Sequence, residues 1–306
     1  MPIHERDPWR LQYFGQVACP ADVHIPTDDI DAYQWYPRHR WLYNKLLVAE
    51  SQGIACAPHG IEPERYPVFS KPAINLKGMG VGSQVLSGRD EYLACERPGF
   101  MWMSLLEGEH VSTDLAVVSG RVCWGRHTLG RPAPGGTFDY WTIEAQLRPA
   151  LEAYCAGWVA ASLADYTGML NLETIGGAII EAHLRFADQW PDLYGPKWLD
   201  SVVRLYAQGG WEYADVPRRD GYSVVLFGPH LRQFPYPPPA LVAAIRAHAS
   251  VSSVQITFDP DKAAEDHVMP PGGFRLAIIN AWDLDVGREC RGELAAGFGL
   301  ESVARA

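Results

Sequence analysis

The chain has 306 residues, 47% of them hydrophobic, which is enough for a sizeable core in one to three domains. Its net charge of −10 and the lack of a basic block argue against a nucleic-acid partner. No apolar run approaches the roughly 18 residues that span a bilayer, no signal peptide is evident, and six scattered cysteines form no CxxC pair, so we expect a cytoplasmic protein with no membrane partner.

The first part of the chain is rich in aromatic side chains, which argues against disorder. We expect residues 1–37 to form an arm that packs on the body of the molecule or on a second copy, as in a homodimer, with a strand over residues 12–18. A helix follows over residues 38–52, ends at Gly53 and carries Lys45.

A glycine-rich loop follows the next predicted strand. The strand covers residues 66–70 and ends at Lys71, and the loop then runs to Ser83 and contains Lys77, Gly78, Gly80 and Gly82. Backbone N–H groups of such a loop can surround phosphates, and a lysine at its root neutralises their charge. Only five of the 26 Lys and Arg residues are lysines, and three of the five surround this loop. The loop therefore predicts phosphate binding, although a GxGxG pattern alone is a weak signal.

The middle of the chain predicts several strands before a long helix. We expect a helical turn over residues 90–95, strands over 100–106, 113–118 and 121–126, and a helix over 145–164. Between the last strand and that helix, Arg126, His127 and Arg131 lead into a Gly/Pro-rich loop. Loops of this kind often carry binding residues, and a solvated basic loop is equally consistent with the pattern.

Acidic residues interrupt the next apolar stretch. Residues 168–175 and 178–184 read as two strands joined by a Gly176-Gly177 turn. Glu173 and Glu181 lie symmetrically about Gly177, so their carboxylates are expected to face each other, and His183 shares the face of Glu181. Such a pair suits Mg²⁺, and an imidazole beside it favours Mn²⁺. The alternatives are an ordinary exposed acidic edge, or glutamates paired with arginines beside a hydrogen-bonded core histidine.

The C-terminal part alternates strands and helices, which predicts a small α+β lobe. We expect helices over residues 196–208, 239–249 and 284–297 and strands over 222–227, 253–258 and 274–280. The whole chain therefore falls in the α+β class.

Four of these motifs, in their order along the chain, resemble the ATP-grasp superfamily. They are the lysine helix at 43–47, the phosphate strand and loop at 67–83, the hinge at 105–109 with its strand to 114, and the metal strands at 168–173 and 180–185. The resemblance implies two β-rich lobes with flanking helices. It divides the chain into an arm (1–40), a small lobe (41–104) and a large lobe with the C-terminal α+β part (105–306).

The resemblance also implies a role for each candidate site residue. The ATP-binding candidates are Lys45, Lys71, Lys77, Gly78, Gly80, Gly82, Glu107 and His110. Glu173, Glu181 and His183 would bind Mg²⁺ or Mn²⁺, and Arg185 and Arg126 are the catalytic candidates. The alternative for Lys45 is a solvated helix residue, and for Arg185 an ion pair with Asp188 or Asp192.

The implied activity is that of an ATP-dependent ligase, which joins a small carboxylate to an amine or similar nucleophile through an acyl phosphate. The sequence departs from the family at several positions: His183 replaces the usual asparagine, His110 the hinge glutamate and Met103 the acidic residue before the hinge, and the arm is shorter than the usual front domain. The alternatives are therefore a nucleotide-binding or regulatory protein that has lost turnover, and a structural protein without a ligand.

Overall fold

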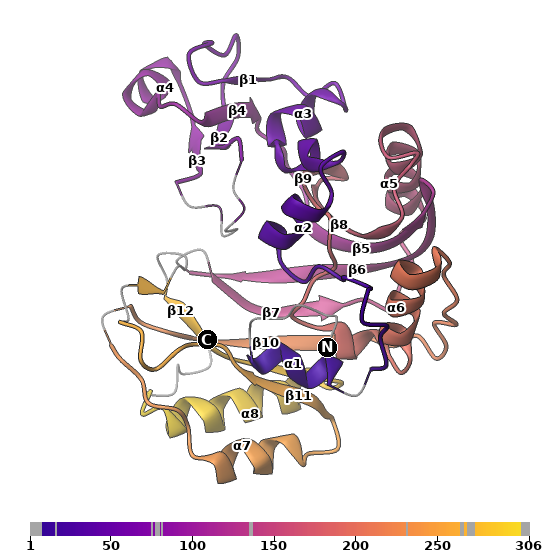
Figure 1. Ribbon diagram of the computed structural model, residues 1–306. Coiled ribbons are helices and arrows are strands. Elements are labelled where there is room, and N and C mark those ends of the chain that lie inside the picture. Colours follow the sequence, from indigo (N-terminus) through magenta and orange to yellow (C-terminus); the bar gives the residue numbers. More distant parts are fainter. Residues whose placement is uncertain are drawn as a thin grey trace.

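The computed structural model describes residues 8–15, 17–74, 76, 80, 82–134, 137–230, 232–263, 266–267 and 273–300. Within them lie two antiparallel sheets flanked by helices (Figure 1). The predicted α+β class, with two β-rich parts and a C-terminal α+β part, is confirmed. Lys77 and Gly78 lie outside the described residues. In the described part of the chain, no helix is both long and apolar enough to cross a membrane.

The smaller sheet carries the root of the glycine loop and has the strand order β1-β4-β2-β3. Its strands are β1 (Cys56–Pro58), β2 (Val68–Pro72), β3 (Gln84–Leu86) and β4 (Phe100–Ser104), and its helices are η1 (Arg40–Tyr43), α3 (Lys45–Glu50) and α4 (Arg89–Cys95). Tyr92 and Trp102 bury against Val68 and Leu86, so this sheet has a core of its own. The single helix predicted over residues 38–52 is divided, because Asn44 is extended and caps α3 instead.

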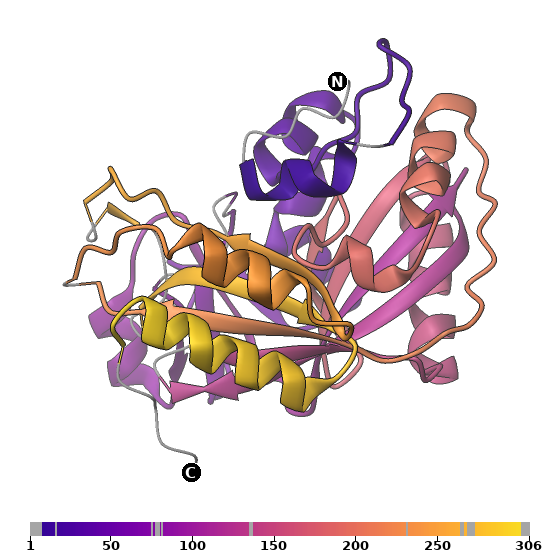
Figure 2. The ribbon, with the colours of Figure 1, turned by 90° about the horizontal axis from the view of Figure 1, so that it is seen from below.

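The larger sheet has eight strands in the order β11-β12-β10-β7-β6-β5-β8-β9. They are β5 (His110–Val118), β6 (Arg121–Ala133), β7 (Thr137–Ile143), β8 (Gly168–Ile175), β9 (Ala178–His183), β10 (Gly221–Gly228), β11 (Val251–Ile256) and β12 (Phe274–Ala281). The helices of this part are α5 (Pro149–Ser162), η3 (Pro191–Tyr194), α6 (Trp198–Gln208), α7 (Pro239–Arg246) and α8 (Leu284–Gly297). Helices α7 and α8 lie side by side over β10–β12 (Figure 2), where Ile245 and Leu294 pack on Val254 and Leu276.

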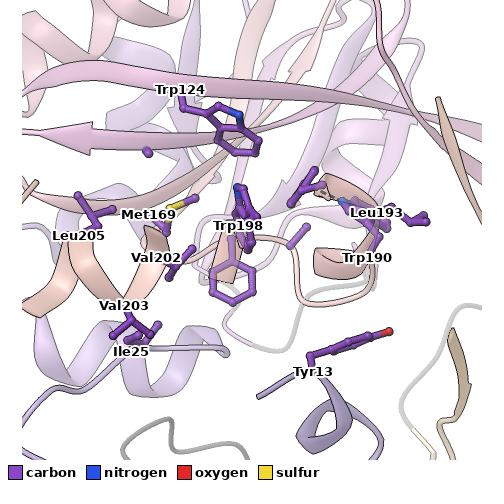
Figure 3. Packing of buried hydrophobic residues seen from close by; sticks show 14 of the residues in the cluster. Tyr13, Ile25, Trp124, Met169, Trp190, Leu193, Trp198, Val202, Val203 and Leu205 are labelled. Carbon is purple, nitrogen blue, oxygen red and sulfur yellow. Dashed lines mark hydrogen bonds between the residues drawn. The ribbon is translucent and has the colours of Figure 1, made fainter. Parts of the chain in front are cut away.

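The arm is part of the core of the same chain. It forms two helices, α1 (Pro8–Phe14) and α2 (Asp29–Trp35), and the strand expected over residues 12–18 is wrong because α1 covers its first part. Tyr13 and Ile25 belong to the hydrophobic cluster that also contains Trp124 and Trp198 (Figure 3). The Tyr13 hydroxyl also lies 2.9 Å from Ser253 Oγ, which ties α1 to β11. The expectation that the arm packs on the body of its own molecule is therefore confirmed.

The predicted Gly/Pro-rich loop after residue 126 is wrong over most of its length. Strand β6 continues to Ala133 and pairs with β7, a strand that the sequence analysis did not predict. Position 130 of the strand requires glycine, because the Cβ of any other residue would lie 2.7 Å from the Phe138 ring. Pro132 stands at a register shift in the ladder, where a missing N–H is tolerated. Arg126, His127 and Arg131 are therefore strand residues.

Candidate functional site

The β8–β9 hairpin places two carboxylates opposite each other. Gly176 and Gly177 form its turn with φ values of 58° and 88°, and Glu173 pairs in register with Glu181. The predicted opposition of these residues is confirmed, but its cause is a β-bulge. The register passes from Thr174 opposite Ile179 to Glu173 opposite Glu181, so Ile180 is the extra residue. Without the bulge, a regular two-residue hairpin would place Ile180 opposite Glu173.

Two lysines from the smaller-sheet part of the chain reach this hairpin. Lys45, the first residue of α3, places its Nζ 3.0 Å from Glu181 Oε1. Lys71 of β2 donates a hydrogen bond of 2.9 Å from Nζ to the carbonyl oxygen of Ile180. Both lysine side chains are 5% exposed, so the alternative of a solvated Lys45 is wrong. Burial lowers the pKa of Lys71 to about 8, although the nearby Glu181 opposes that shift.

Two histidines face the carboxylates from the large sheet. His110 Nε2 lies 3.0 Å from Glu173 Oε2, and His183 Nε2 lies 3.6 Å from Glu173 Oε1 and 3.8 Å from Glu181 Oε1. Burial opposes protonation of both rings, but the hydrogen bond to Glu173 raises the pKa of His110 and the charge of Asp29 raises the pKa of His183 to about 10. Burial also disfavours the Glu173 carboxylate, yet the hydrogen bond from His110 and the neighbouring His183 hold its pKa well below the usual range.

Asp29 is a member of this site that the sequence analysis missed. It belongs to α2 in the arm, is 6% exposed and accepts from Arg185 Nη2 at 2.9 Å and from His183 Nδ1 at 3.1 Å. The alternative for Arg185, an ion pair with Asp188 or Asp192, is therefore wrong in its partner. Burial disfavours the Asp29 carboxylate, but the neighbouring Arg185 and His183 lower its pKa below the ordinary value. Burial also disfavours the charged form of Arg185, but Asp29 raises its pKa. Glu173 and Glu181 keep 30% and 22% of their side chains exposed.

Arg126 does not join this group in the described structure. Its guanidinium is 1% exposed and donates from Nη1 to Asp215 Oδ2 at 3.3 Å and from Nη2 to the carbonyl oxygen of Arg219 at 3.2 Å. A buried strand residue committed to an aspartate argues against the catalytic role expected for Arg126, and the solvated-loop alternative is wrong for this residue.

The hinge segment packs directly on the hairpin turn. A Cβ on Gly176 would lie 2.2 Å from the carbonyl oxygen of Glu107, and a Cβ on Gly108 would lie 2.7 Å from Gly176 Cα. Gly176 N also donates to the Glu109 carbonyl oxygen at 3.2 Å. In the glycine loop, Gly80 and Gly82 have φ values of 56° and 79°, which suit glycine. The structure thus joins hinge and hairpin by close backbone contact.

The expected metal site is only partly formed. Among the described residues, no three His, Cys, Asp or Glu side chains are arranged as a metal-binding group. Nδ1 of His183 is bound to Asp29 at 3.1 Å, so its Nε2 is the nitrogen that faces the two carboxylates and is left to join them as a ligand. This Nε2 is buried without a hydrogen-bond partner. Glu173 and Glu181 still offer the oxygen ligands that fit Mg²⁺.

The whole chain resembles solved structures of ligases at low sequence identity. An L-amino acid ligase from Bacillus licheniformis has a TM-score of 0.62 and 13% identity, with 93% of this chain and 82% of that chain covered. N5-carboxyaminoimidazole ribonucleotide synthetase from Thermus thermophilus has a TM-score of 0.60 and 15% identity, with coverage of 97% and 86%. Phosphoribosylamine–glycine ligase from Thermotoga maritima has a TM-score of 0.60 and 14% identity, with coverage of 92% and 84%.

No family model matches the sequence, and no curated protein matches it. The likeness to solved structures is one of fold. The chain therefore has the ATP-grasp fold that its four motifs predicted.

Proposed function

We propose that this protein is an ATP-dependent ligase that joins a small carboxylate to an amine or similar nucleophile through an acyl phosphate. One observation carries the proposal: two buried lysines from the smaller-sheet part lie against two opposed glutamates of the large sheet. A bound nucleoside triphosphate requires cationic groups that neutralise its phosphates and, beside them, anionic groups that hold a divalent metal. The structures with the same fold, named above as ligases, support this class of reaction.

In this proposal the lysines and the glycine loop hold the nucleotide. Lys45 and Lys71 neutralise phosphate charge, and the backbone of the loop, with Lys77, Gly78, Gly80 and Gly82, closes over the phosphates. Glu107 and His110 belong to the segment that, by the resemblance, lies near the nucleoside. His110 also balances Glu173, to which it is already bound at 3.0 Å.

The two glutamates would hold a divalent cation, Mg²⁺ or Mn²⁺. When bound, that ion neutralises the phosphates and makes the γ-phosphorus a better electrophile. His183 Nε2 lies 3.6 Å from Glu173 Oε1 and 3.8 Å from Glu181 Oε1, between the two carboxylates. With His183 Nε2 as a third ligand, the site would accept Mn²⁺ at least as well as Mg²⁺.

The reaction transfers the γ-phosphoryl group and then displaces it. A carboxylate oxygen of the substrate attacks the γ-phosphorus, and ADP leaves with the electrons of the broken P–O bond. The amine then attacks the acyl carbon, inorganic phosphate leaves, and the amine loses a proton. Arg185 balances the charge of the substrate carboxylate and of the acyl phosphate. The protein contributes positioning and charge neutralisation throughout.

The test is release of inorganic phosphate from ATP in the presence of Mg²⁺, over a panel of amino acids and small carboxylates paired with amines. Phosphate release that requires both substrates supports the ligase. The second candidate is a nucleotide-binding protein without turnover, favoured by His110 at the hinge and its bond to Glu173. ATP binding by calorimetry without phosphate release on any pair would establish it, and absence of ATP binding would exclude both.

We also propose a homodimer, although the contacts of the described residues do not argue for it. The aromatic arm that suggested a second copy buries Tyr13 and Phe14 in its own chain. Light scattering gives the mass in solution directly, and a monomer would remove the dimer from the proposal.

A further inference from the structure

Asp29 is the point at which the arm enters the candidate site. Its carboxylate accepts from Arg185 Nη2 at 2.9 Å, from His183 Nδ1 at 3.1 Å and from the Tyr43 hydroxyl at 3.3 Å. The partners come from three different places: the end of the β8–β9 hairpin, the segment just after it, and η1. Asp29, a residue of the arm, therefore connects His183 and Arg185, which follow Glu181 along the chain.

Two roles are open to a carboxylate bound to a substrate-facing arginine. It can occupy the place of a substrate acid and block it, or it can fix the arginine for the substrate. The burial of the arm decides between them. Ile25, Thr27 and Ala32 are at most 1% exposed, so α2 and the segment just before it are anchored in the core. A blocking segment has to leave, and this one would uncover core side chains by leaving.

The contacts of Arg185 show what Asp29 does to it. Nη2 binds Asp29 and Nη1 donates to the Phe186 carbonyl oxygen at 3.2 Å, so two groups hold the guanidinium in one orientation. The side chain remains 18% exposed, and a guanidinium has five N–H donors, of which these bonds use two. Asp29 likewise binds His183 through Nδ1, which turns Nε2 toward Glu173 and Glu181.

We infer that Asp29 is a positioning residue of the phosphoryl-transfer site: it orients Arg185 toward the γ-phosphate and the acid substrate, and it orients His183 behind the two glutamates. The inference rests on the proposed function. It assigns the arm a part in the site, because the carboxylate that pre-orients the arginine is supplied by α2. Pre-orientation lowers the entropy lost when the anion binds.

The experiment compares Asp29→Asn with Asp28→Asn in the full chain. Asp28 is the neighbouring acid and caps α2 by accepting from Asp31 N, and asparagine is an equally good cap, so this control removes the same charge from the same helix without touching the site. The readout is the ratio of ATP to ADP affinity, measured by calorimetry with Mg²⁺. A purely structural change weakens both nucleotides alike, whereas a misplaced Arg185 weakens only the one with a γ-phosphate.

We expect Asp29→Asn to lower the ATP/ADP affinity ratio about tenfold, which corresponds to one weakened charge-assisted contact, and Asp28→Asn to leave the ratio unchanged. If Asp29→Asn does not fold, Asp29→Glu keeps the buried charge but moves the carboxylate by one methylene, and the same drop is expected.

An unchanged ratio in the folded Asp29 variant overturns the inference, as does a rise in ATP affinity, which would make the arm a plug. Wild-type protein that binds neither nucleotide would instead refute the proposed function.

Discussion

The carbonyl oxygen of Ile180 accepts a hydrogen bond of 2.9 Å from Lys71, and Ile180 is the extra residue of the bulge in β9. A bulge leaves one residue outside the regular ladder and turns the residues that follow it. Here the same bulge turns Glu181 to face Glu173 and supplies the carbonyl that holds the lysine. The anionic and the cationic halves of the site thus depend on one irregularity in one strand.

The first prediction concerns nucleotide binding by Lys71. Lys71→Ala removes a buried ammonium from the root of the glycine loop, and we expect ATP binding to weaken by about 1.5–3 kcal/mol, the value of one charge-assisted contact. Calorimetry with Mg²⁺ and ATP measures it. Lys262→Ala is the control, because that lysine is exposed. Equal affinities for wild type and Lys71→Ala would remove Lys71 from the site.

The second prediction uses the lowered pKa of Lys71. The folded pKa of about 8 lies below the ordinary 10.5, so between these values the unfolded chain binds more protons and stability rises with pH. The difference in unfolding free energy between wild type and Lys71→Met should therefore move in favour of wild type from pH 8 to pH 10, by at most about 1.4 kcal/mol per pH unit. ATP affinity should fall over the same range, since the phosphates need the ammonium.

Urea denaturation at several pH values measures the first effect, and calorimetry the second. Parallel pH profiles for the two proteins would show that Lys71 does not titrate in this range.

The third prediction separates a ligand from a counter-charge at His183. If the ring is a fixed cation, His183→Asn removes a positive charge that lies 3.6 Å from Glu173 and 3.8 Å from Glu181. Divalent-cation affinity, measured by calorimetry with a non-hydrolysable ATP analogue, should then rise roughly tenfold for both Mg²⁺ and Mn²⁺. His39→Asn, which breaks a histidine–aspartate pair with Asp165, is the control. A selective loss of Mn²⁺ affinity would instead identify His183 as a metal ligand.

Local patterns were sufficient to predict the hairpin and the residues it brings together. The Gly-Gly turn, the lysine at the end of β2 and the acids on β8 and β9 each carry a signal within a few residues. The bulge carries none: Ile180 is an apolar residue in an apolar strand. The expected symmetry of Glu173 and Glu181 about Gly177 was thus correct through an irregularity that sequence spacing does not show.

Other features could not be predicted because their partners lie far along the chain. Asp29 lies in a run of acids that reads as a helix start, and its partners His183 and Arg185 are 154 and 156 residues away. Strand β7 was missed because Gly130 and Pro132 suggest a loop. Glycine is required there by the Phe138 ring, which belongs to the strand that was missed.

The last prediction concerns the contact between hinge and hairpin. Gly176 and Gly177 are neighbours in one turn and both have positive φ, so alanine at either position should cost about 1–2 kcal/mol of stability from backbone strain alone. They differ in surroundings: a Cβ at Gly177 meets nothing within 4 Å, whereas at Gly176 it would lie 2.2 Å from the Glu107 carbonyl oxygen.

Because two backbone segments cannot both stay in place around that Cβ, Gly176→Ala should destabilise the protein more than Gly177→Ala, by about 1–3 kcal/mol in urea denaturation. It should also weaken ATP binding in the protein that remains folded, because the displaced hinge carries Glu107 and leads into His110. Equal stabilities for the two variants would show that the hinge moves away freely, and equal ATP affinities would show that its position does not matter to the nucleotide.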